Sequence, residues 1–142
     1  MNNYDKEQQI IEWLKEYNFY KAGIENLKQS IEDIAEEGIS ANISEEAKGG
    51  SNKFHSTVED AVLKIDRLNI NRKIKVMANI VLKLDKALES LNEMERTVIT
   101  NRCINGEYYY QFCYKIGASE RTAKRIKKEA IKKMSIVIFG ID

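Results

Sequence analysis

The side chains best suited to chemistry in this sequence are the cations close to its C-terminal end. Arg121, Lys124 and Arg125 follow Ser119 at spacings that place them on one outward face of a helix. Guanidinium and ammonium groups on such a face can donate hydrogen bonds to guanine O6 and N7 in the major groove of DNA. The neighbouring Glu120 can accept a hydrogen bond from cytosine N4. These four side chains are therefore the predicted base contacts.

A second set of groups would hold the phosphates. Ser119 can cap a helix whose free backbone N–H groups then point at phosphate. Lysines further along the same helix, with two cations from the preceding elements, would add charge. The alternative is a solvated lysine face on an ordinary helix. The predicted phosphate contacts are Arg102, Lys115, Ser119, Lys127, Lys128, Lys132 and Lys133.

The remaining composition argues against catalysis. The 142 residues include one histidine and two cysteines, and no phosphate-binding loop or nucleophile motif occurs. We expect no catalytic residues, no metal and no cofactor, hence a protein that is not an enzyme. Cys103 and Cys113 are expected to be reduced thiols in a cytosol.

Charge is distributed unevenly along the chain. Residues 1–60 carry six lysines and 13 acidic residues, whereas residues 95–142 carry ten basic and five acidic residues. An acidic body with a basic final third indicates a polyanionic partner. No apolar run approaches the ~20 residues that span a bilayer, and no secretory signal is recognisable. We therefore expect a cytoplasmic protein of a bacterial cell, associated with the nucleoid and not with a membrane.

The elements that position the cations are three predicted helices. Asn92 and Glu95 form a capping box, and the helix that they start runs to about Ile104. A short helix over 109–116 is followed by Gly117 and by a helix from Ser119 to about 134. A short helix, a glycine turn and a capped basic helix are typical of a helix-turn-helix. The inward residues of the last helix are Ala123, Ile126, Ala130 and Met134.

The first 90 residues predict helices over 5–18 and 21–37, a flexible loop over 38–55 and a long helix with a heptad seam over 74–91. The partner of that seam is either residues 21–37 or the same helix of a second subunit, which would make a homo-oligomer. The predicted fold is all-α, with a coiled-coil-like helical region over 1–90 and a helix-turn-helix domain over 91–142.

Residues 91–134 resemble region 4 of bacterial sigma factors, which reads the promoter −35 element. The resemblance is carried by Glu95-Arg96, Val98-Ile99, Gln111-Phe112-Cys113, Ile116-Gly117-Ala118-Ser119 and Arg121-Thr122-Ala123-Lys124-Arg125-Ile126. It implies a helix-turn-helix that binds double-stranded DNA and can contact RNA polymerase.

The whole chain is similar to phage-encoded transcriptional regulators of the ArpU and RinA type. The N-terminal part of this similarity lies in Asn26-Leu27, the Gly49-Gly50 loop and residues 56–62. It implies a sequence-specific transcription regulator, an activator of late phage or prophage genes. Two alternatives stay open, namely a small-terminase-like protein that recognises a DNA packaging site, and a helical module that binds a protein such as RNA polymerase.

Overall fold

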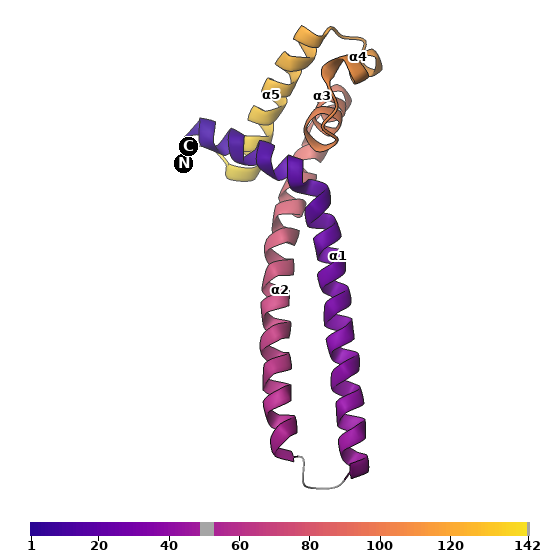
Figure 1. Ribbon diagram of the computed structural model, residues 1–142. Coiled ribbons are helices and arrows are strands. Elements are labelled where there is room, and N and C mark those ends of the chain that lie inside the picture. Colours follow the sequence, from indigo (N-terminus) through magenta and orange to yellow (C-terminus); the bar gives the residue numbers. More distant parts are fainter. Residues whose placement is uncertain (49–52, 142) are drawn as a thin grey trace. The chain divides into compact units, whose positions relative to one another are not determined.

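The computed structural model describes the backbone of residues 1–48 and 53–141 and the side chains of residues 1–36 and 58–141. Across these ranges the chain is helical and contains no strand, so the predicted all-α class is confirmed (Figure 1). In the described chain, no helix has an apolar stretch long enough to span a membrane. The elements are α1 (Asn3–Lys48), α2 (Lys53–Ser90), α3 (Glu93–Ile99), the π-helical turn η1 (Thr100–Ile104), α4 (Tyr109–Ile116) and α5 (Glu120–Phe139).

The N-terminal helices differ from the prediction. The expected helices over 5–18 and 21–37 are one continuous helix, α1, which passes through Gly38. The expected loop over 38–55 is wrong at both ends, because α1 continues to Lys48 and α2 starts at Lys53; residues 49–52, which include the Gly49-Gly50 pair, lie outside the described residues. Gly38 does not end α1 because an isolated glycine costs a helix only about 1 kcal/mol relative to alanine. The chain also has no proline, the residue that would force the helix to stop.

The chain divides into two compact units, and the division does not fall at the predicted boundary between residues 90 and 91. Residues 21–78 form one unit, here called the hairpin unit. Residues 1–20 and 79–142 form the other, here called the terminal unit. The first turns of α1 and the last turns of α2 therefore belong with the helix-turn-helix and not with the rest of their own helices.

In the hairpin unit, the two long helices run antiparallel beside each other (Figure 1). Ile24, Leu27 and Ile31 of α1 are half-buried, as are Ile74 and Met77 of α2. These are the apolar positions that the heptad-like spacing predicts for packing between two helices. Within this unit, the predicted seam is therefore covered by the same chain.

The core of the terminal unit draws on every helix except α4. Ile10 and Leu14 of α1 pack with buried residues from α2, α3, η1 and α5, and Ile138 and Phe139 at the end of α5 pack against the same cluster. The ring of Phe139 stacks on Trp13 with 6.0 Å between centroids. Helix α5 thus continues five residues past the predicted end at Met134. The buried residues are Ile10, Leu14, Leu84, Ala87, Leu91, Ile99, Cys103, Ala130, Ile131 and Met134.

Candidate nucleic-acid interface

Helix α3 begins at the predicted capping box. The backbone N–H of Glu95 donates to Asn92 Oδ1 at 2.8 Å, and the backbone N–H of Asn92 donates to Glu95 Oε1 at 3.2 Å. The helix then widens into η1, where the N–H of Asn105 bonds to the carbonyl of Thr100. Gly106 follows with φ of 69°, a left-handed conformation that suits glycine. These features fix the point at which the chain leaves α3 for α4.

The turn between α4 and α5 contains the predicted glycine and the predicted serine cap. Gly117 caps α4 in the left-handed region, with φ of 60° and ψ of 33°. Ser119 is the N-cap of α5, and its Oγ accepts a hydrogen bond from the backbone N–H of Thr122 at 3.2 Å. Residues 117–119 thus connect α4 to α5, and the predicted short helix, glycine turn and serine-capped helix follow one another in the structure.

A small apolar cluster holds α4 against α5. Phe112 of α4 and Val98 of α3 are fully buried, and Ile126 of α5 packs with them. Ala123 is also fully buried and gives α5 a small residue on its inward face. Close packing of this kind fixes the orientation of the opposite, outward face of α5.

The outward face of α5 is cationic. Glu120, Arg121, Lys124, Arg125 and Lys128 are all exposed, as their spacing predicts. Within the described residues, Arg121, Arg125 and Lys128 make no side-chain hydrogen bond or ion pair, and Lys124 lies with its Nζ 5.7 Å from the centre of the Tyr109 ring. The cations best placed to meet a base edge are therefore not neutralised by the protein's own carboxylates.

The Arg102 side chain makes its contacts with other residues of the terminal unit. Its Nη1 donates to the Glu107 carbonyl at 3.1 Å, and its guanidinium lies over the Tyr109 ring at 5.2 Å. Its Nε is buried and has no hydrogen-bond partner among the described residues. Burial raises the pKa of the Tyr109 hydroxyl, while a hydrogen bond from Arg102 acts in the opposite direction. The structure gives Arg102 a bracing role, and its phosphate contact stays a prediction.

Lys133 likewise has a partner within the protein. Its Nζ lies 2.7 Å from Glu95 Oε2, which joins α5 to the capping box of α3. Burial by itself would raise the pKa of the Glu95 carboxyl, but the hydrogen bonds from Lys133 and from the Asn92 backbone outweigh it and hold the pKa below its ordinary value. Lys133 therefore stabilises the packing of α5 whether or not it also meets a phosphate.

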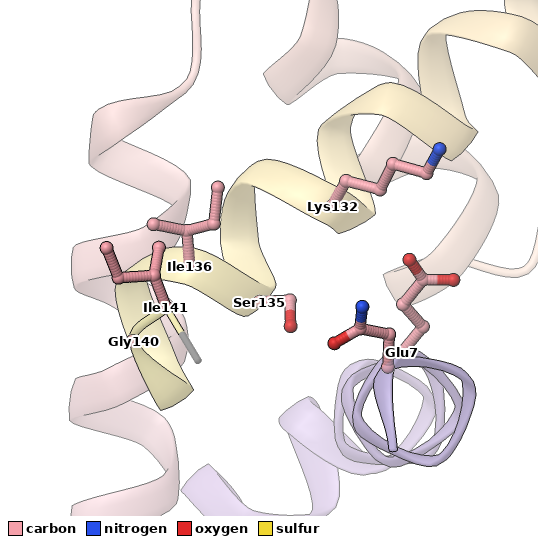
Figure 2. Close-up of a pocket in the computed structure, with 7 residues that line it drawn as sticks. Glu7, Lys132, Ser135, Ile136, Gly140 and Ile141 are labelled. Carbon is pink, nitrogen blue, oxygen red and sulfur yellow. The ribbon is translucent and has the colours of Figure 1, made fainter.

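The other predicted phosphate contacts are scattered. Lys115 is exposed and its Nζ approaches Asn101 Oδ1 at 3.4 Å, whereas Lys127 is half-buried. Lys132 lines an open cavity of about 430 Å³ beside the first turns of α1 (Figure 2). Figure 2 shows Lys132 and Ser135 of α5 on one side of this cavity and Glu7 of α1 on the other. The cavity is lined by Asn3, Glu7, Lys132, Ser135, Ile136, Gly140 and Ile141.

An exposed aromatic cluster near α4 had no predicted role. Tyr108, Tyr110 and Tyr114 are all exposed, and the rings of Tyr108 and Tyr110 stack 5.8 Å apart. Tyr109 instead turns inward beside Phe112. The helical period alone could have separated these roles, because Tyr109, Phe112 and Ile116 repeat at the spacing of one helix face.

Comparisons with known proteins add no identity to this geometry. No protein-family model, no curated protein and no solved structure matches the chain significantly. The case for a function therefore depends on the geometry and charge of the helix-turn-helix itself.

Proposed function

We propose that this chain is a sequence-specific DNA-binding transcription regulator of a phage or prophage, which inserts the start of α5 into the major groove. The observation that carries the proposal is the cationic face of α5, which is held outward by packing on α4 and has no acidic partner for Arg121 or Arg125. In a helix-turn-helix, the N-terminal residues of the second helix reach the base edges. Arg121, Lys124 and Arg125 lie within the first two turns of α5.

The dimensions of the helix support this mode of binding. A major groove about 12 Å wide admits one α-helix, and two turns of helix extend about 11 Å along the axis. Arg121, Lys124, Arg125 and Lys128 follow one another at steps of three, one and three residues, which keeps them on one face. A helix entering the groove by its N-terminal end would present all four to a few consecutive base pairs.

Local charge also favours a polyanion over an apolar partner. The exposed acids of α5 are Glu120, which the proposal assigns to cytosine N4, and Glu129, and they are outnumbered by the exposed cations Arg121, Lys124, Arg125, Lys128, Lys132 and Lys133. The acidic residues of the chain are concentrated in residues 1–60. Similarity to region 4 of sigma factors supports the same assignment, and it makes RNA polymerase the protein partner to test after DNA.

A binding experiment across salt concentrations tests the proposal. Fluorescence anisotropy would measure the affinity of the full chain for random duplex DNA and for fragments selected from its own genomic neighbourhood. We expect the logarithm of affinity to fall linearly with the logarithm of salt concentration, and one selected fragment to bind at least about 1000-fold more tightly than random duplex. A folded sample that binds no duplex at low salt would overturn the proposal.

Substitutions then assign the contacts. Arg125→Ala is expected to cost about 1–3 kcal/mol on the selected site and to relax the preference at one base pair, because one bidentate contact is lost. The matched control is Lys86→Ala, which removes an exposed cation from α2, away from the α5 face. Equal losses on selected and random DNA for Arg125→Ala would make this arginine a phosphate contact and not a base contact.

A further inference from the structure

The exposed face of α5 limits which bases this helix can read. From 120 to 128, every exposed side chain is charged, and none is an amide or an apolar group. Asparagine or glutamine pairs with adenine N6 and N7, and an apolar group contacts the methyl group of thymine. The start of α5 therefore exposes neither of the two kinds of group that best identify an A·T pair. The exposed residues are Glu120, Arg121, Lys124, Arg125 and Lys128.

The side chains in this stretch that could contact a thymine methyl group are turned away from the cationic face. Ala123 and Ile126 are buried. Thr122 is half-buried, and its Oγ1 accepts a hydrogen bond from Ser119 Oγ at 3.1 Å. Packing on α4 and the cap of α5 thus keep these three side chains in use within the protein.

The two arginines of this face favour guanine. In the part of the chain that the structure describes, neither Arg121 nor Arg125 makes a side-chain hydrogen bond or ion pair. A guanidinium group can donate two parallel hydrogen bonds, and guanine offers two acceptors, O6 and N7, on its major-groove edge. Adenine offers one acceptor beside a donor, and thymine offers one acceptor beside its methyl group. Two unpaired arginines therefore select two guanines.

The spacing of the arginines sets the distance between these guanines. Arg121 and Arg125 are four residues apart, which is about 6 Å along the helix and about 40° around it. Successive base pairs are separated by about 3.4 Å. A helix that lies along the groove thus places the two guanidinium groups about two base-pair steps apart, and a tilted helix places them closer together.

We propose that the DNA site of this chain has a core of G·C pairs, with two guanines inside about three consecutive base pairs. Arg121 and Arg125 read O6 and N7 of these guanines, and Glu120 accepts a hydrogen bond from N4 of a neighbouring cytosine. This inference rests on the proposed function, because it concerns the base preference of the same α5 face. It adds the composition of the site, which the proposed function leaves open.

Site selection from a random duplex library, with the full chain as bait, tests this composition. We expect the selected sites to share two guanines inside about three consecutive base pairs. Modified duplexes then identify the edge that is read. Replacing either guanine with 7-deazaguanine removes the N7 acceptor, and it should weaken binding by about tenfold or more. The matched control is inosine, which keeps O6 and N7 and lacks only the minor-groove amino group, so it should bind nearly as well as guanine.

Protein variants assign each base to its side chain. In Arg121→Ala, 7-deazaguanine at one of the two guanines should cost no further affinity, whereas at the other guanine it should keep its full effect. Glu120→Gln should shift the preference at one position from cytosine toward adenine, because glutamine pairs with adenine N6 and N7. Lys86→Ala, the control on α2, should respond to both modified bases as the wild type does. Circular dichroism checks that the variants keep their helix content.

The possible results separate this inference from the proposed function. A chain that selects a core of A·T pairs would overturn guanine reading and leave sequence-specific DNA binding in place. The same holds for a site at which 7-deazaguanine costs no affinity at any guanine. If inosine weakened binding as much as 7-deazaguanine does, reading from the major groove would be wrong. A folded chain that binds no duplex at low salt would overturn the proposed function, and this inference with it.

Discussion

Replacing Lys133 with methionine separates a structural role of this lysine from a role in phosphate binding. The side chain of Glu95 is 7% exposed and that of Lys133 is 56% exposed. A hydrogen bond to a charged group contributes about 1.5–3 kcal/mol, and the exposed lysine end of this pair lowers the figure toward that of a surface ion pair. We therefore expect Lys133→Met to destabilise the protein by about 1–2 kcal/mol. Methionine preserves most of the apolar stem, so lost packing contributes little.

The pH dependence of this loss identifies its cause. Because Lys133 and the Asn92 backbone hold the pKa of Glu95 below its ordinary value of 4.5, the stabilisation is present above that pH. It is lost as the pH falls through the pKa of the folded state. Urea titrations at pH 7 should show a midpoint lowered by about 0.5–1 M for a slope of about 2 kcal/mol per M. The difference between the two proteins should shrink below about pH 4.5.

Lys132→Met is the matched control, because Lys132 is an exposed lysine next in sequence that has no hydrogen bond or ion pair among the described residues. It should leave the urea midpoint unchanged. If Lys133→Met were as stable as the wild type at pH 7, or if its deficit were the same at pH 7 and at pH 3, the ion pair with Glu95 would not be the source of the stability. A loss of DNA affinity without a loss of stability would assign Lys133 to the phosphates.

Four further perturbations test the packing of the helices. Phe112→Ala removes a fully buried ring and should cost about 3–5 kcal/mol in urea unfolding, with loss of DNA binding. Gly117→Ala should lower the free energy of unfolding by about 1 kcal/mol, because φ is 60° at this position, although an added Cβ would meet no atom within 4 Å. Gly23→Ala should instead raise the thermal midpoint, because alanine favours the helix more than glycine does. The atom nearest to the added Cβ, the Sδ of Met77 at 3.3 Å, belongs to a flexible side chain that can move. A fragment of residues 91–142 should show no cooperative thermal transition, because it lacks the α1 and α2 side chains that cover α5.

Local signals in the C-terminal third were sufficient to predict its elements. Asn92 with Glu95, and Ser119 with Thr122, are caps whose partners lie three residues away. Gly117 adopts the backbone conformation that glycine favours at a helix end. Because each signal depends on atoms close in sequence, tertiary contacts did not override it. The exposure of the cationic face of α5 followed from the same helical period.

The sequence could not predict which side chains of the protein itself interact with the cations of the candidate site. Lys133 meets Glu95 across 38 positions of the chain. A spacing pattern places Lys133 on a helix face but cannot say which carboxylate lies opposite it. Arg102, which lies in η1, is likewise placed over the Tyr109 ring by the path of the chain between η1 and α4, which no spacing pattern specifies.

The domain boundary shows the same limit at larger scale. A heptad seam over 74–91 predicts that another helix packs on this face of α2. The pattern does not identify that helix, because any apolar helix face would satisfy it equally well. In the structure, Met77 is half-buried in the hairpin unit, whereas Leu84 lies in one cluster with Ile10 and Leu14. The helix-turn-helix therefore depends on residues at the opposite end of the chain. A change at Ile10 or Leu14 should consequently weaken DNA binding through the packing of α5, although neither residue belongs to the cationic face.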